Sequence, residues 1–145
     1  MKLFGNLLVC ALIISATVTC ADNNQASSVE QDYKFRGQHL LASYYDCDHN
    51  ALADVNTLRQ VMEQAVVASG ATLLKSAEYI FEPDGITAVY LLSESHASIH
   101  TYPEHNACFV DLFTCGNKCS SEKFNAVLQS YLKPQRVDKE EVIRK

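Results

Sequence analysis

The chain lacks several features that would each indicate a particular class of protein. It has no Cys-x-x-Cys pair, so a structural zinc site is not expected. It has no excess of basic residues, and its net charge of −5 argues against a surface that binds nucleic acid. It also has no internal repeat. What remains is a chain of 145 residues, 48% hydrophobic and 20% charged, which is typical of one globular domain with a single core.

No apolar run reaches the roughly 20 residues that a membrane-spanning helix needs. The first 21 residues nevertheless have the pattern of a secretory signal peptide, because Lys2 is followed by the apolar run 7–16 and then by small and polar residues. Cleavage after Ala21 would leave a soluble product, whereas cleavage before Cys20 would leave a cysteine for a lipid anchor. We therefore expect export, to a periplasm or to a membrane anchor.

Residues 22–36 are rich in serine, asparagine and glutamine and predict a polar linker, which leaves residues 37–145 as the folded domain. Four of the six cysteines fall in this domain: Cys47, Cys108, Cys115 and Cys119. They do not have the spacing of a disulfide framework. In an exported domain, Cys115 and Cys119 would be able to pair.

Hydrophobic periodicity predicts eight elements in the order β-α-β-β-β-β-α-β. The strands are expected at 39–47, 71–81, 86–93, 97–102, 107–115 and 135–143. The dipeptide Asp84-Gly85 between two apolar runs predicts a hairpin, and a second turn is expected at residues 103–106.

Two helices complete the pattern. Asn50 is expected to cap the first helix, whose apolar residues recur every three or four positions until Gly70 ends it. Ser120 or Ser121 is expected to cap the second helix, which Pro134 ends. This order of elements predicts a two-layer α+β sandwich, in which an antiparallel sheet has both helices packed on one face.

The stretch SESHASIHTYPE, residues 93–104, has an unusual number of reactive side chains for a strand. Each alone has a structural explanation, since a strand histidine is usually a surface or core residue and a cysteine is often a buried small hydrophobe. Three blocks in order are more specific: Glu-Ser-His, Ile-His-Thr-Tyr-Pro-Glu and Phe-Thr-Cys-Gly. Together with GQHLLASYYDCD upstream, they resemble the bacterial pyruvoyl-dependent S-adenosylmethionine decarboxylase proenzymes, from His39 to Gly116.

The resemblance implies that the chain makes its own cofactor by autocatalytic cleavage. The hydroxyl of Ser95 would attack the carbonyl of Glu94 and turn the peptide bond into an ester. Elimination from this ester would split the chain and leave dehydroalanine at position 95, which hydrolyses to a pyruvoyl group with loss of ammonia. His100 matches the base of the elimination. Thr87 stands where the family has a serine that steadies the tetrahedral intermediate, and Ala88 replaces a usual glycine. These two departures predict slower cleavage.

The resemblance also implies the later chemistry. The pyruvoyl group would form a Schiff base with the substrate and act as an electron sink. Cys115 matches the acid that protonates the product, and a thiol is largely protonated at neutral pH. Phe81 lies where the family stacks the adenine ring, and Glu104 where a carboxylate binds the ribose. Tyr79 replaces a histidine often found there, and Tyr102 replaces a tryptophan.

The expected function is decarboxylation of S-adenosylmethionine to the aminopropyl donor of spermidine biosynthesis, by a homodimer as in the family. One alternative is a pyruvoyl-dependent arginine or ornithine decarboxylase, which would need an extra carboxylate in its pocket and would not need Phe81. The other is a catalytically silent exported binding homologue, because S-adenosylmethionine is made and used in the cytosol. No metal is expected at Asp46–His49, which the resemblance places at a strand end.

Overall fold

The computed structural model describes residues 35–145. The predicted signal peptide, the anchor expected at Cys20 and nearly all of the predicted linker lie outside these residues. Among the helices that are described, none has the length and apolar character required to cross a membrane.

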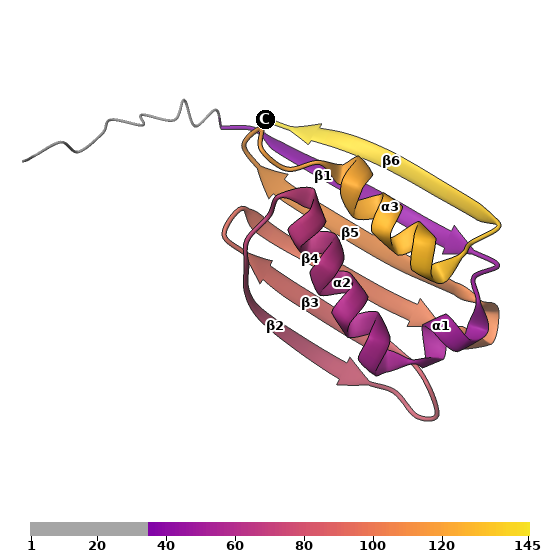
Figure 1. The fold of residues 1–145 in the computed structure, drawn as a ribbon. Helices are drawn as coiled ribbons and strands as arrows, with labels where there is room; N and C mark the ends of the chain where they lie inside the picture. The colour runs from indigo at the N-terminus through magenta and orange to yellow at the C-terminus, as the bar shows by residue number, and fades with distance from the viewer. Residues whose placement is uncertain (1–34) are drawn as a thin grey trace, which may run out of the picture. The chain divides into compact units, whose positions relative to one another are not determined.

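Six strands form one sheet in which every hydrogen-bonded pair of neighbours is antiparallel. The strands are β1 (Gly37–Tyr45), β2 (Leu73–Ile80), β3 (Ile86–Leu92), β4 (Ser95–Tyr102), β5 (Ala107–Cys115) and β6 (Arg136–Arg144). Their order across the sheet is β2-β3-β4-β5-β1-β6 (Figure 1). The first strand therefore lies between two strands that come much later in the chain.

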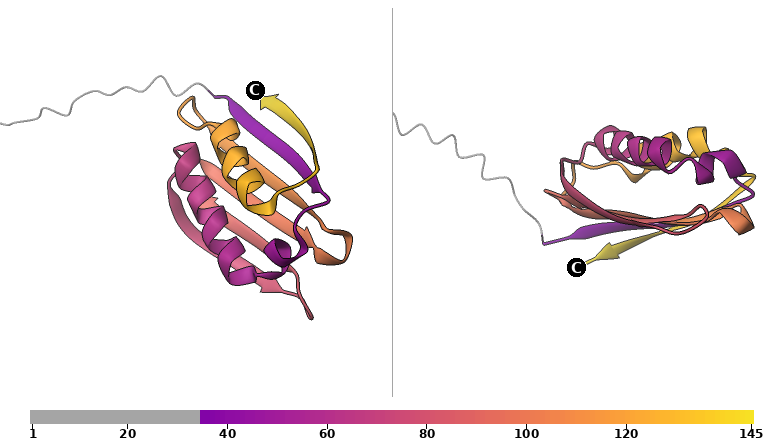
Figure 2. Two further views of the ribbon diagram at one scale, coloured as in Figure 1. Left: turned by 45° about the vertical axis from the view of Figure 1, so that its right-hand side comes forward. Right: turned by 90° about the horizontal axis from the view of Figure 1, so that it is seen from below.

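The helices are α1 (His49–Ala53), α2 (Val55–Ser69) and α3 (Ser121–Leu132), and a 3-10 turn, η1, covers Pro103–His105. In the right-hand view of Figure 2, α2 and α3 lie on the same side of the sheet. The prediction of a two-layer α+β sandwich with helices on one face is confirmed.

The prediction of one continuous helix from Asn50 to Gly70 is wrong. Asp48, not Asn50, caps α1, and its side chain accepts a 2.9 Å hydrogen bond from the backbone N–H of Asn50. Asp54 then caps α2, because its side chain accepts from the N–H and the hydroxyl of Thr57. A side chain that binds the backbone in this way satisfies the free N–H groups of a new helix, so the chain restarts at Val55.

The other helix ends agree with the sequence. Gly70 has a φ of 91°, a left-handed conformation that glycine adopts without steric cost, and it ends α2. Ser120 caps α3 by accepting a 3.3 Å hydrogen bond from the N–H of Lys123. Lys133, just before Pro134, has a φ of 48° and ends α3.

The core lies between the helices and one face of the sheet. Leu58 and Met62 of α2, and Phe124 and Leu128 of α3, have no exposed side-chain surface. The sheet contributes alternate residues, as a strand with one buried face must. Tyr44 is one of them, and its hydroxyl donates a 2.5 Å hydrogen bond to the side-chain oxygen of buried Asn125.

The opposite face of the sheet, here called the uncovered face, has no helix on it in the described part of the chain. It nevertheless carries large hydrophobic side chains that are more than a third exposed: Leu41, Tyr79, Val89, Leu91 and Phe109. An apolar surface of this kind typically marks an interface or a binding site.

Candidate active site

The bond between Glu94 and Ser95 lies in the tight connection between β3 and β4. Ser93, in the same connection, donates a 3.0 Å hydrogen bond from its N–H to the carbonyl of Thr72. The N–H of Cys115, the last residue of β5, donates a 2.9 Å hydrogen bond to the carbonyl oxygen of Glu94. A backbone N–H therefore already binds the oxygen of the carbonyl group that Ser95 would attack.

The side chain of Glu94 is held as well as its carbonyl. Its carboxylate accepts a 2.9 Å hydrogen bond from the N–H of Thr72 and a 3.3 Å hydrogen bond from the Thr72 hydroxyl. The hydroxyl of Ser93 also donates to it at 3.3 Å. The sequence did not indicate Thr72, because a single threonine within a predicted strand belongs to no motif.

Ser95 is the first residue of β4 and is partly buried. Its hydroxyl lies 3.4 Å from Nδ1 of His96, within hydrogen-bonding distance. In the ladder with β5, Ser95 is opposite Thr114, the neighbour of Cys115. The structure therefore brings three of the predicted residues together: Glu94, Ser95 and Cys115.

Cys115 is a partly buried free thiol beside a hollow of about 300 Å³. The ring of Phe113 and the guanidinium of Arg144, which lies 4.4 Å from the ring centre, line the same hollow. The Phe113 ring lies so close to Gly37 that a Cβ there would come within 2.3 Å of it. Gly37 is needed for this wall of the hollow, because any other side chain would displace the ring.

Thr87 and His100 form a second group. They are opposite one another in the β3–β4 ladder, and the Thr87 hydroxyl is hydrogen-bonded to Nδ1 of His100. Both side chains are partly buried. The hydroxyl and the imidazole that the sequence assigned to cleavage are therefore in direct contact.

The predicted substrate residues belong to this second group. Phe81 and Glu104 line one cavity of about 410 Å³, together with His100 and Tyr102. The rings of Phe81 and His100 are 6.2 Å apart, and those of His100 and Tyr102 are 4.7 Å apart. Tyr79 packs its ring edge-on against Phe81 at 4.8 Å. An aromatic wall with a carboxylate at one side suits a ligand with a flat ring and hydroxyl groups.

Within one chain, the two groups do not meet. Ser95 begins β4 and His100 is the sixth of its eight residues, so the two are five positions apart along the strand. At about 3.3 Å per residue, this places their backbones roughly 17 Å apart. The group around Ser95 lies at one end of β4, and the group around His100 lies near the other.

The residues Asp46–His49 have structural roles. Asp48 caps α1, and Cys47 is buried in the core. Nδ1 of His49 is 3.2 Å from the carbonyl oxygen of Pro103, and its Nε2 is 3.7 Å from the carboxylate of Asp84. Over residues 35–145, no cluster of three His, Cys, Asp or Glu side chains is arranged to hold a metal ion.

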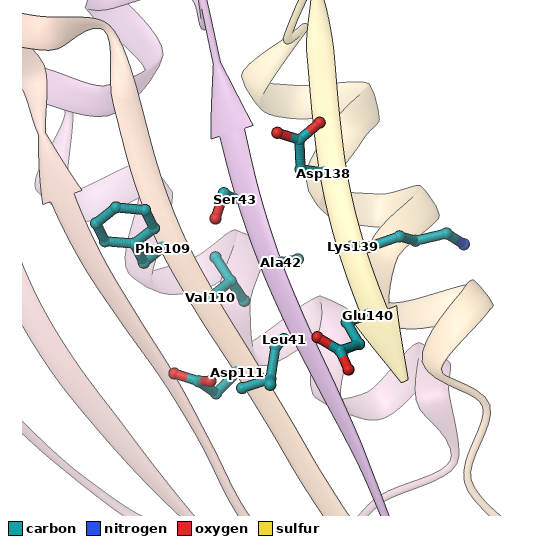
Figure 3. A pocket seen from close by; sticks show the side chains of 9 residues that line it. All are labelled: Leu41, Ala42, Ser43, Phe109, Val110, Asp111, Asp138, Lys139 and Glu140. Atoms are coloured by element: carbon teal, nitrogen blue, oxygen red, sulfur yellow. The ribbon is translucent and has the colours of Figure 1, made fainter. Parts of the chain in front are cut away.

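Another hollow, of about 460 Å³, lies on the uncovered face over β1, β5 and β6 (Figure 3). Its rim carries the carboxylates of Asp111, Asp138 and Glu140, while Lys139 points away from them. None of the predicted site residues lines it. Phe109, at its edge, packs its ring 5.6 Å from Tyr102 and so connects this surface with the second group.

Comparisons with known proteins agree with the geometry. A solved structure, the adenosylmethionine decarboxylase from Aquifex aeolicus VF5, matches with a TM-score of 0.68 and 38% identity, over 73% of this chain and 88% of that one. The fold and the site thus define a decarboxylase enzyme.

Sequence relatives give the particular family. The S-adenosylmethionine decarboxylase proenzyme of Thermosipho africanus is 42% identical over 77% of this chain and 85% of its own length. That of Thermotoga maritima is 42% identical over 72% of this chain and 80% of its own. The family described as S-adenosylmethionine decarboxylase matches residues 38–145. The chain belongs to this family, as its sequence blocks indicated.

Proposed function

We propose that the chain cleaves itself between Glu94 and Ser95 and that the product decarboxylates S-adenosylmethionine. The observation that supports this most is the hydrogen bond from the Cys115 N–H to the carbonyl oxygen of Glu94, 2.9 Å long. When the Ser95 hydroxyl attacks this carbonyl, negative charge develops on its oxygen. A donor fixed there beforehand stabilises that charge without reorganisation.

The residues present fit a pyruvoyl group at position 95. Cleavage would leave residue 95 as the first residue of β4, beside the Cys115 end of β5 and its hollow. When formed, such a group supplies an electron sink for loss of carbon dioxide. The thiol of Cys115 would then hold the proton that the product needs.

Phe81 and Glu104 support a nucleoside as part of the substrate. Phe81 offers a ring that is 45% exposed in the cavity, which a purine ring could stack against. Glu104 offers hydrogen-bond acceptors to the hydroxyls of a ribose. A basic amino acid such as arginine or ornithine would use neither feature in this way, so S-adenosylmethionine, the precursor of a spermidine aminopropyl donor, is the substrate that we propose.

The working unit that we propose is a homodimer. Ser95 and His100 are too far apart in one chain for direct proton transfer. Side chains alternate between the two faces of a sheet, and this alternation places both Cys115 and His100 on the uncovered face. A second copy packed on this face by a twofold axis would bring the His100 group of one chain to the Ser95 group of the other. The exposed hydrophobic side chains of the uncovered face support such packing.

An intact-mass spectrum of the purified full chain tests the cleavage. From the wild type we expect two chains: one that ends at Glu94, and one of residues 95–145 whose N-terminus is blocked by the pyruvoyl group. The Ser95→Ala variant should remain uncut. An uncut wild type after long incubation would contradict the proposal and favour a silent binding homologue.

Release of labelled carbon dioxide tests the substrate. We expect it from S-adenosylmethionine, and we expect Phe81→Ala to raise KM by about 10-fold or more with little effect on cleavage, because a lost stacking partner costs about 1–3 kcal/mol. Release from arginine or ornithine, and none from S-adenosylmethionine, would contradict it.

A further inference from the structure

Two cysteines that the proposed reaction does not use lie next to each other in the core. Cys47 is 6% exposed and Cys108 is 0% exposed. Asp46, with a left-handed φ of 52°, turns the chain at the end of β1. The N–H of Cys47 then donates a 2.8 Å hydrogen bond to the carbonyl of Asn106, two residues before Cys108. The end of β1 is thus folded back onto the start of β5.

The side chains of the two cysteines are buried in the same region. Both belong to the same cluster of buried hydrophobic residues, and Tyr44, three residues before Cys47, is opposite Cys108 in the β1–β5 ladder. Interaction with Cys108 lowers the pKa of the Cys47 thiol, whereas interaction with Cys47 and burial raise the pKa of the Cys108 thiol.

We propose that Cys47 and Cys108 form a disulfide when the protein folds in an oxidising thiol–disulfide buffer. One of the two thiolates attacks a low-molecular-weight disulfide and releases one thiol. The other thiolate then attacks the cysteine in the mixed disulfide and releases the second thiol. The two cysteines lose two electrons and two protons together, and the external disulfide is reduced to two thiols.

This disulfide would join the two products of cleavage, a consequence that rests on the proposed function. Cys47 precedes the bond between Glu94 and Ser95, and Cys108 follows it. The N-terminal and C-terminal chains would then stay covalently linked. The signal peptide predicted at residues 1–21 makes an oxidising compartment relevant, since disulfides form and persist there.

The disulfide would leave the proposed acid free. Cys108 and Cys115 are seven residues apart on the same strand, β5. At about 3.3 Å per residue, their backbones are separated by roughly 23 Å. Oxidation of the buried pair and a reduced Cys115 are therefore compatible in one molecule.

The first experiment uses the full-length Ser95→Ala variant, which does not depend on cleavage. It is unfolded, refolded in a buffer of reduced and oxidised glutathione, alkylated and digested. We expect a peptide linked through Cys47 and Cys108, loss of both thiols from alkylation, and alkylated Cys115. Recovery of Cys47 and Cys108 as alkylated thiols, or a different dominant pairing, would overturn the proposal.

The second experiment tests the link between the chains. On a denaturing gel, wild type isolated from an oxidising compartment should migrate as one full-length species without reductant and as two chains with reductant. Cys119→Ala should behave in the same way, whereas Cys47→Ala should give two chains in both lanes. Two chains from wild type without reductant would overturn the link. If wild type stays a single chain after reduction, the proposed cleavage has failed, and the peptide map still decides the disulfide.

Discussion

Thr72 binds the carboxylate of Glu94 with both its N–H, at 2.9 Å, and its hydroxyl, at 3.3 Å. Glu94 is therefore fixed at two points, since its carbonyl oxygen is held by Cys115 at 2.9 Å. In the proposed cleavage, holding the junction in this way would orient the carbonyl for attack by Ser95, and orientation is a large part of the rate of such intramolecular reactions.

Thr72→Val should slow cleavage about 3- to 10-fold, because it removes one hydrogen bond to a charged group but keeps the backbone N–H. A time course of chain splitting by mass spectrometry measures this. Thr72→Ser, which keeps the hydroxyl, is the matched control. Equal rates for wild type and Thr72→Val would show that the hydroxyl does not position the junction.

Thr87→Val should slow cleavage about 100-fold, because valine has nearly the same shape but cannot hydrogen-bond to His100 or to a developing oxyanion. Thr87→Ser should cleave faster than wild type, since it restores the smaller residue usual in the family. The same time course compares the three proteins. A wild-type rate for Thr87→Val would remove the hydroxyl from the mechanism.

Two inactive variants should rescue each other if the Ser95 and His100 groups act across a dimer. Ser95→Ala keeps an intact His100, and His100→Ala keeps an intact Ser95. When the two are co-expressed with different tags, the His100→Ala chain should be cleaved and the Ser95→Ala chain should not. Each variant alone is the control. Absence of cleavage in mixed dimers isolated through both tags would contradict the shared site.

Cys115→Ala should still cleave, because the contact with the Glu94 carbonyl comes from the backbone N–H, which alanine retains. Its turnover of S-adenosylmethionine should fall about 10²- to 10⁴-fold, the usual cost of losing a general acid. Cleavage by intact mass and carbon dioxide release separate the two effects, with Cys119→Ala as control. Full turnover by Cys115→Ala, or by protein whose Cys115 is oxidised, would contradict this role.

Stability should fall at alkaline pH because of a buried phenol. Burial, with nearby Glu63 and Glu78, raises the pKa of Tyr90 to about 12, and its hydroxyl has no hydrogen-bond partner among the described residues. The folded state favours the neutral phenol, whereas the unfolded chain ionises it above about pH 10. The free energy of unfolding is therefore unaffected by Tyr90 below about pH 10 and falls by about 2 kcal/mol as the pH rises toward 12.

Tyr90→Phe should therefore unfold at nearly the wild-type urea concentration at pH 7 and be less sensitive to alkali. Urea titrations at pH 7 and at higher pH measure the difference. Tyr44, whose pKa is also raised by burial, keeps part of the dependence in both proteins. Identical curves at every pH would rule out Tyr90 as a source of alkaline instability.

The strands and the fold class were predictable because one-sided burial leaves an alternating pattern, as in Cys108, Val110 and Leu112 of β5. The break between α1 and α2 was not, because the apolar pattern continues through Asp54 and only its bond to Thr57 restarts the helix. The position of β1 between β5 and β6 could not be predicted from the local sequence pattern either, since it depends on pairing between distant segments.

For the candidate site too, some features could be predicted from the sequence and others could not. Its residue types came from the resemblance, and the roughly 17 Å between Ser95 and His100 could have been predicted from their five-residue spacing on one strand. The contacts of Thr72 and Cys115 with Glu94 could not, because they join residues far apart in the sequence.

The order of the sheet decides when a cut at residue 94 can occur. Such a cut gives β1, β2 and β3 to one product and β4, β5 and β6 to the other, while β1 remains paired with both β5 and β6. Neither product alone contains all the partners of its own strands, because β1 would be separated from β5 and β6, and β3 from β4. Assembly would therefore have to be finished before the backbone is broken. Maturation is then a one-way event. Without a covalent link between its chains, a mature protomer that unfolds must find its other half in solution before it can refold. Refolding of the protomer should therefore depend on protein concentration after cleavage, while refolding of a single uncut precursor chain should not.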